Sequence, residues 1–266
     1  MVELNTIYNE DCFETIKRMD NGSVDVVLTS PPYNNSRTSH SEYSMNIRNC
    51  RYIDFDDNKT NDEYSNWTVE LFNGYDQILK PNGVVLYNIS YGNENPNVLW
   101  ETLFAIMHNT NFMIAETIIW KKKSAFPNNA SHNHLTRITE FVFVFCRKWE
   151  YETFKINKQI KSYSNIGQPF YENIFNYIEA KNNDEKCPIN GATYSTELCE
   201  KLLNIFASPQ STIYDSFMGT GTTAVACKLL GLNYIGSEIS KQQWEWSMNR
   251  LGETKTKDNK VTKSLW

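Results

Sequence analysis

The stretch that decides the fold is Val24-Asp25-Val26-Val27-Leu28-Thr29-Ser30-Pro31-Pro32-Tyr33-Asn34. Its valine-rich first part is typical of a β-strand that is buried on both faces of a sheet. The two prolines cannot continue a strand, because each fixes its own φ and has no backbone N–H to donate. The chain is therefore predicted to leave the sheet in a stiff turn at the carboxyl end of this strand.

The predicted turn places hydrogen-bond acceptors beside an aromatic ring. The Ser30 hydroxyl and the backbone oxygens of Ser30 and Pro31 have few partners in the sheet, and Tyr33 follows them closely. Such a set suits a flat group with an NH2 substituent, which donates hydrogens in its own plane while its face stacks on the ring. A plain strand end with a proline turn explains the same residues, so a second motif is needed.

The second motif is Thr212-Ile213-Tyr214-Asp215-Ser216-Phe217-Met218-Gly219-Thr220-Gly221-Thr222-Thr223. It reads as a strand, a glycine turn and the start of a helix. Gly219 and Gly221 allow the backbone to turn tightly and to approach a ligand closely. Thr222 or Thr223 is predicted to cap the helix.

A strand predicted at 233–239 follows that helix and carries Glu238 near its end. A carboxylate at the tip of the second strand of such a unit is placed to accept both ribose hydroxyls of an adenosine. The third glycine of the dinucleotide fingerprint is absent, because threonines and an alanine follow Gly221. A cofactor without a pyrophosphate group therefore fits this turn better than NAD does.

Hydrophobic spacing predicts the remaining elements. A short strand at Ile7 is followed by a helix that starts after the N-cap Asp11 and ends at Asn21-Gly22. Ser195 is the predicted N-cap of a later helix. We expect helices at 64–79, 97–109 and 194–206, with a turn at 80–83, and strands at 83–90, 114–120 and 138–146.

Together, Ser-Pro-Pro-Tyr and Asp-Ser-Phe-Met-Gly-Thr-Gly-Thr-Thr resemble the motifs of the DNA amino-methyltransferases, which methylate the exocyclic nitrogen of cytosine or adenine. Their order is similar to that of the circularly permuted beta group. The resemblance covers most of residues 5–251, whereas 35–62 and 150–190 match no known motif. It implies an α/β, Rossmann-like methyltransferase fold: a mostly parallel sheet with helices on both faces and an antiparallel hairpin.

The resemblance also implies roles for individual residues. Ser30 and the Pro31 carbonyl would hold the target amine, beside Pro32, and Tyr33 would stack on the extruded base. Asp215 would orient the methionine amino group of S-adenosyl-L-methionine, and 190–195 would lie along its amino-acid end. The implied cofactor contacts are Asp11, Cys12, Thr29, Ser195, Asp215, Phe217, Gly219, Gly221, Thr222 and Glu238, with no metal.

The substrate is narrowed by the first residue of the catalytic motif. In the resembled family a serine there accompanies mostly cytosine-N4 activity, and aspartate or asparagine mostly adenine-N6 activity. Ser30 therefore favours N4 of cytosine, with N6 of adenine as the alternative. Two other classes stay open: an RNA or protein methyltransferase, and a DNA-binding regulator without catalysis. Asparagine at this position marks glutamine methylators, and Ser30 departs from that.

Composition bounds the class of protein. The 266 residues, 40% of them hydrophobic, suit one ordered domain, and the net charge of −5 argues against a generally cationic DNA binder. Six cysteines without a Cys-x-x-Cys pair, no leader-like start and no transmembrane-length apolar run indicate a cytoplasmic protein with no membrane association. We expect a catalytic half at 1–34 and 63–149, a mobile loop at 35–62, target recognition at 150–190, a cofactor half at 191–251, and a flexible tail at 252–266.

Basic residues suggest where double-stranded DNA would bind. Residues 121–161 include nine Lys or Arg but only three Glu, and aromatic residues are interleaved with them. This pattern is typical of a stripe that binds phosphates. The short recognition segment favours a brief target site or recognition shared with a second subunit; a homodimer and a cognate restriction endonuclease are both compatible partners. The predicted DNA contacts are Arg37, Arg48, Arg51, Lys121, Lys122, Lys123, Arg137, Lys155, Lys158 and Lys161.

Overall fold

The structure is a computed structural model. It describes residues 2–34, 57, 59–92, 95–125, 127, 132–184, 190 and 193–254. The predicted mobile loop at 35–62 lies largely outside the described residues, and with it the predicted DNA contacts Arg37, Arg48 and Arg51. None of the described helices has the length and apolarity needed to span a membrane.

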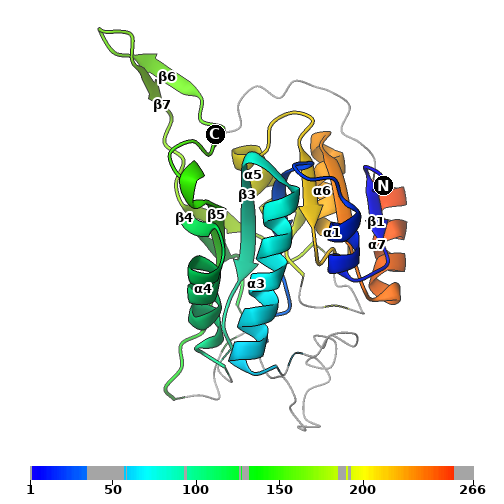
Figure 1. Ribbon diagram of the computed structural model, residues 1–266. Coiled ribbons are helices and arrows are strands. Elements are labelled where there is room, and N and C mark those ends of the chain that lie inside the picture. Colours follow the sequence, from blue (N-terminus) through cyan, green and yellow to red (C-terminus); the bar gives the residue numbers. More distant parts are fainter. Residues whose placement is uncertain are drawn as a thin grey trace.

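One eight-stranded sheet forms the centre of the protein (Figure 1). Strand β5 is antiparallel to both of its neighbours, and all other neighbouring strands in this sheet are parallel. The predicted antiparallel hairpin is therefore β4 and β5, with β5 in an interior position. In spatial order the strands are β1 (Thr6–Tyr8), β10 (Asn233–Ser237), β9 (Thr212–Asp215), β2 (Val24–Thr29), β3 (Leu79–Ile89), β5 (Thr139–Arg147), β4 (Phe112–Lys122) and β8 (Tyr177–Ala180).

Helices cover both faces of the sheet, as predicted. Alternate residues of β2 enter different cores: Val27 packs in one, while Val26 and Leu28 pack in the other. The Val27 side is covered by α1 (Cys12–Arg18), α3 (Asn61–Ile78) and α4 (Val98–Asn109), and the opposite side by α5 (Thr196–Phe206), α6 (Thr222–Leu230) and α7 (Lys241–Glu253).

A crevice opens where β9 and β2 lie side by side. After β9 the chain enters α6 on one face of the sheet, and after β2 it continues to α3 on the other. Because the two connections leave in opposite directions, the carboxyl ends of these strands border a gap that is the usual ligand site of open parallel sheets. The two sequence motifs follow these same two strands, so the crevice brings them together.

Local differences from the expected elements have physical causes. Helix α1 ends at Arg18, before the predicted stop at Asn21-Gly22. The turn predicted at 80–83 falls inside β3, where pairing with β2 jumps from Val24↔Leu79 to Val26↔Val84. The extra residues form an irregularity that absorbs the proline and a positive φ at Asn82. Helix α7 was not predicted, because its buried stripe is narrow.

A two-stranded arm projects from one end of the sheet. Strands β6 (Ile160–Tyr163) and β7 (Pro169–Tyr171) form a separate antiparallel pair. The arm leaves from the end opposite the carboxyl end of β3 (Figure 1). Asn157, just before it, bonds the carbonyls of Ile205 and Ala207 at the end of α5. The predicted recognition segment therefore begins far from the crevice.

Candidate active site

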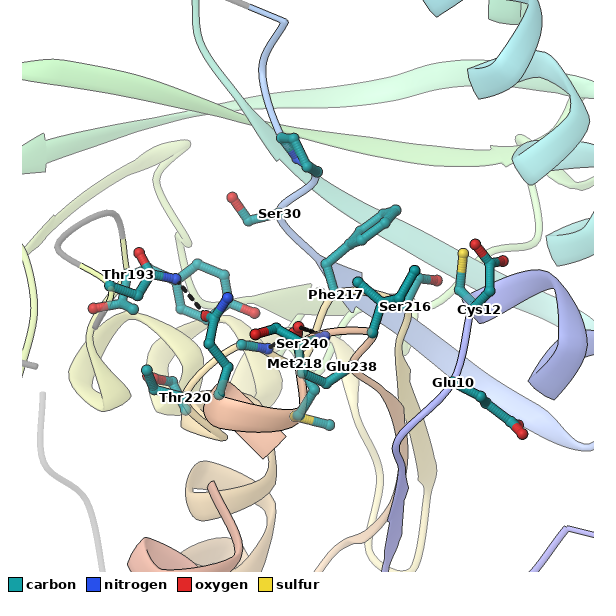
Figure 2. A pocket seen from close by; sticks show the side chains of 18 of the residues that line it. Glu10, Cys12, Ser30, Thr193, Ser216, Phe217, Met218, Thr220, Glu238 and Ser240 are labelled. Carbon is teal, nitrogen blue, oxygen red and sulfur yellow. Dashed lines mark hydrogen bonds between the residues drawn. The ribbon is translucent and has the colours of Figure 1, made fainter. Parts of the chain in front are cut away.

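A cavity fills the crevice at the carboxyl ends of β9 and β2. The empty space of this cavity, together with the solvent at its mouth, amounts to about 910 Å³. In Figure 2, Ser30 lies on one side, Glu238 and Ser240 lie on the other, and the Phe217 ring points away from Glu238 and Ser240. The lining residues are Glu10, Asp11, Cys12, Ser30, Pro32, Trp67, Asn190, Thr193, Tyr194, Ser216, Phe217, Met218, Gly219, Thr220, Thr222, Glu238, Ile239, Ser240 and Gln243.

The structure brings the two motifs into this one cavity, as their pairing predicts. Ser30 and Pro32 come from the proline turn, and the glycine turn adds three of its predicted contacts. Asp11 also caps α1, accepting a hydrogen bond from the Phe13 N–H at 2.8 Å. The predicted cofactor residues that line the cavity are Asp11, Cys12, Phe217, Gly219, Thr222 and Glu238.

Glu238 ties the glycine turn to the end of β10. One carboxylate oxygen accepts the Gly219 N–H at 2.7 Å, and the other accepts the Ser240 N–H at 2.8 Å. The side chain is buried at 7% exposure. Because each carboxylate oxygen has more than one lone pair, these bonds leave acceptor capacity toward the cavity.

Asp215 lies beneath the cavity and is not one of the described residues that line it. Its carboxylate accepts hydrogen bonds from the hydroxyls of Thr29, Tyr194 and Thr223 at 2.6–2.9 Å and from the Phe217 N–H at 3.0 Å. Burial raises the pKa of this carboxyl, while its four donors act in the opposite direction. Thr29 and Asp215 therefore join β2 to β9 beneath the described lining of the cavity.

Ser195 and Gly221 also lie outside the described lining. Ser195 caps α5, as predicted, by accepting from the Leu198 N–H, and it donates to the Lys181 carbonyl. The prediction that a threonine caps α6 is wrong: Gly221 is the N-cap, in the left-handed region at φ +82°, with no side-chain cap. A threonine would be strained at this φ, and Thr223 instead bonds Asp215.

Gly221→Ala is expected to lower the free energy of unfolding by about 1–3 kcal/mol. The φ of +82° disfavours a side chain, and an added Cβ would lie 2.9 Å from the Cβ of Ser247 and 3.2 Å from its Cα. Urea unfolding measures the loss. Gly252→Ala is the control, because nothing lies within 4 Å of its added Cβ. Equal stability of the two variants would contradict the expectation.

Tyr33 contacts the site through its hydroxyl. The oxygen lies 3.2 Å from Ser30 Oγ, 3.2 Å from Asn88 Oδ1 and 3.1 Å from Glu140 Oε2. Of the four predicted catalytic residues, the lining includes Ser30 and Pro32 but not Pro31 or Tyr33. The turn is held from below by Tyr64, whose hydroxyl donates to the Pro32 carbonyl at 2.6 Å.

Some lining residues were not predicted as site residues. Trp67 was assigned only to the buried face of α3, yet its ring lies 5.6 Å from that of Phe217. Gln243 belongs to α7, which the sequence pattern missed, and it accepts from the Asn190 amide at 2.7 Å. Asn190 was expected near the cofactor. Only the packing of α3 and α7 reveals the other two, because neither lies in a motif.

Three lysines of the predicted basic stripe form ion pairs in the structure. Lys121 pairs with Glu179 at 2.8 Å, Lys123 with Glu197 at 3.2 Å, and Lys122 with Glu140.

Arg137 bonds the Tyr91 carbonyl and lies over the Tyr91 ring. Lys161 lies in β6 and Lys155 and Lys158 in the segment leading to the arm, at the opposite end of the sheet from the cavity. The structure therefore separates Lys155, Lys158 and Lys161 from the cavity, whereas Lys122 pairs with Glu140 close to Tyr33.

The acidic and aromatic side chains that line the cavity suit S-adenosyl-L-methionine. Its described lining contains the carboxylates of Glu10, Asp11 and Glu238 and the rings of Trp67 and Phe217, but no lysine or arginine. Carboxylates and aromatic faces favour a ligand with an ammonium and a sulfonium group, whereas a pyrophosphate would lack positive partners. Burial raises the pKa of the lining Cys12 thiol, which leaves it uncharged and unsuited to act as a nucleophile.

Comparisons with known proteins agree with this site. The family model described as "DNA methylase" matches residues 24–249. The chain is 26% identical to the type II methyltransferase M.HinfI of Haemophilus influenzae, over 97% of this chain and 71% of that protein. It is 23% identical to M.Cfr9I of Citrobacter freundii, over 94% and 89% of the two chains.

Solved structures share the fold. The cytosine-N4-specific PvuII DNA methyltransferase superposes with a TM-score of 0.71 at 19% identity, covering 98% of this chain and 89% of that one. The M1.HpyAVI–SAM complex matches with a TM-score of 0.58 at 24% identity, covering 92% and 98%. With the family model matching most of the chain and both motifs on one cavity, this protein belongs to the S-adenosyl-L-methionine-dependent DNA amino-methyltransferases of the beta group.

Proposed function

We propose that this chain methylates N4 of cytosine in double-stranded DNA, at a base turned out of the duplex, as the modification enzyme of a restriction-modification system. The observation that carries the proposal is that Ser30, at the end of β2, lines the same cavity as the glycine turn after β9. N6 of adenine is the second candidate, because the cavity offers an acceptor for either exocyclic amine.

An aromatic amine is a weak nucleophile, because its lone pair is delocalised into the ring. The Ser30 hydroxyl and the Pro31 carbonyl would accept its hydrogens and localise that pair on nitrogen. The cofactor, when bound, supplies a methyl group on a positively charged sulfur. Holding the amine in line with that group would provide most of the rate enhancement. Extruding the base costs roughly a few kcal/mol, which stacking on the Tyr33 ring would offset in part.

The proposed cofactor contacts divide between two elements. Asp11, at the start of α1, would accept the adenine amine, and Glu238, at the end of β10, would accept the ribose hydroxyls. Phe217 and Gly219 shape the pocket between them. Asp215 is proposed to act indirectly, because its oxygens already accept four hydrogen bonds from the protein.

One experiment tests the reaction and the base together. DNA is incubated with the enzyme and labelled S-adenosyl-L-methionine, digested to nucleosides, and examined by mass spectrometry. We expect N4-methyldeoxycytidine. N6-methyldeoxyadenosine would select the second candidate. Label on RNA or protein but not on DNA would refute the proposal.

Glu238→Gln is expected to weaken cofactor binding about tenfold. The two carboxylate oxygens of Glu238 accept the N–H groups of Gly219 and Ser240. A glutamine has only one carbonyl oxygen, so its NH2 group would face one of these two N–H groups. Titration calorimetry with S-adenosyl-L-methionine measures the change. Glu253→Gln, at the end of α7 and outside the cavity lining, is the matched control. An unchanged dissociation constant for the Glu238 variant would remove it from the cofactor site.

A further inference from the structure

The hydroxyl of Tyr33 is the centre of a hydrogen-bond cluster behind Ser30. It lies 3.2 Å from Ser30 Oγ, 3.2 Å from Asn88 Oδ1 and 3.1 Å from Glu140 Oε2. The lining of the cavity includes Ser30 but not Tyr33, Asn88 or Glu140. Asn88 is buried at 2% exposure. The cluster therefore contacts Ser30 from the protein side, at the end of β3 and the start of β5.

The direction of each hydrogen bond in the cluster is determined by its neighbours. Asn88 Nδ2 donates to the Phe141 carbonyl at 2.9 Å, so Asn88 Oδ1 faces Tyr33 and can only accept. Glu140 pairs with Lys122 through its other oxygen, and a carboxylate has no hydrogen to give. The single hydroxyl hydrogen of Tyr33 therefore goes to Asn88 or Glu140.

The same reasoning orients Ser30. The hydroxyl hydrogen of Tyr33 is donated to Asn88 or Glu140, so the Tyr33 oxygen can only accept from Ser30. The Ser30 hydroxyl is therefore the donor in this pair. The Ser30 hydrogen then points at Tyr33, away from the cavity that Ser30 lines. Only lone pairs of Ser30 Oγ remain for a ligand.

We propose that Asn88 and Glu140 are positioning residues that act through Tyr33 to hold the Ser30 hydroxyl as a hydrogen-bond acceptor. The inference rests on the proposed function, with cytosine as the target base. A hydroxyl that can only accept forms a hydrogen bond with an NH2 group of the base. A carbonyl oxygen in the same place would face the lone pairs of Ser30 Oγ and form no hydrogen bond. The cluster therefore selects cytosine, which carries NH2 at C4, over uracil, which carries a carbonyl oxygen there. An unconstrained serine could donate to uracil just as well as it accepts from cytosine.

The test compares binding of two duplexes that carry the site methylated by the wild type. One has cytosine at the target position and the other uracil, and S-adenosylhomocysteine replaces the methyl donor so that no turnover occurs. The cost of extruding each base is a property of the duplex, so it cancels when the cytosine-to-uracil preference is compared between proteins. Tyr33→Phe keeps the ring, and we expect it to lower this preference about tenfold to a hundredfold. Tyr8→Phe, whose lost hydroxyl bonds only the Glu3 N–H among the described contacts, should keep it.

Two further variants separate orientation from structural support. In Glu140→Gln the amide oxygen would stay with Lys122 and its NH2 would face Tyr33. We expect a smaller drop in preference, because Asn88 Oδ1 still accepts. Ser30→Ala should lose the preference as Tyr33→Phe does, and the double variant should lose no more, because both changes remove one interaction. A structural defect would instead add to the loss.

The outcomes distinguish this inference from the proposed function. If the wild type methylates DNA and Tyr33→Phe keeps the full preference for cytosine, the inference is overturned and the function stands. Additive losses in the double variant overturn it as well. An unchanged preference in Glu140→Gln removes Glu140 from the cluster's role. If the wild type methylates no DNA, both fall.

Discussion

Ser30→Ala is expected to lower the rate of methyl transfer by roughly 10²- to 10³-fold, as the removal of one oriented hydrogen-bond group at a reacting centre usually does. Ser30 is the only side chain of the proline turn with a hydroxyl in the described cavity lining. Without its oxygen, one amine hydrogen loses its acceptor and the nitrogen lone pair stays delocalised. Single-turnover methylation at saturating cofactor measures the effect.

The fold should be unaffected by this change. Ser30 lies past the end of β2, and Tyr33 is the only side-chain partner of its hydroxyl among the described contacts. Ser23→Ala is a matched control at the other end of the same strand, where the buried hydroxyl has no described hydrogen-bond partner. It should methylate DNA at the wild-type rate. Methylation by Ser30→Ala within a few-fold of wild type would show that the reaction does not use this oxygen.

Asp215→Ala is expected to lower the free energy of unfolding by about 3–5 kcal/mol, because donors buried beneath the site lose a charged acceptor. Tyr194 and Thr223 can still bond one another, since their hydroxyl oxygens lie 2.6 Å apart. The Thr29 hydroxyl and the Phe217 N–H have no described alternative. Thermal and urea unfolding measure the loss, and cofactor affinity should fall as the Phe217 turn loosens.

Asp215→Asn is the matched variant and should retain most of the stability, with a loss of about 1 kcal/mol. The asparagine oxygen can accept from Thr29 and Phe217, and its NH2 can donate to the oxygens of Tyr194 and Thr223, whose hydroxyls rotate. A loss as large as that of Asp215→Ala would show that the negative charge, rather than the acceptor, is what the site needs.

The pH dependence of the Asp215→Asn comparison has a definite sign. Burial raises the folded-state pKa of Asp215 above its unfolded value of about 3.9. Its contribution to stability is therefore complete below the unfolded pKa and declines as the pH rises through the folded pKa. The stability of Asp215→Asn relative to wild type should rise over that same interval. A relative stability that falls as the pH rises there would contradict the assigned direction.

Local patterns were enough to predict most strands and helices, and the resemblance to the family supplied their arrangement as a sheet with helical layers. The valine run before Ser30 formed β2, and the amphipathic spacing around Tyr64 formed α3, because burial of a periodic stripe needs only neighbours along the chain. The failures lay where long-range contacts decide. α7 buries little beyond Ser247 and Leu251, so its sequence has almost no helical signature of its own.

The sequence by itself determined the family, the order of the two motifs and the placement of both at strand ends, because each of these depends on adjacent residues. Tertiary structure decided which motif residues face the cavity. Glu238 lines it, while Asp215 accepts hydrogen bonds from hydroxyls of β2, α6 and Tyr194 beneath it. It also neutralised Lys121, Lys122 and Lys123 with carboxylates from distant segments. The physical reason is that a side chain's role depends on its hydrogen-bond partners, and these partners come from parts of the chain that only folding brings together.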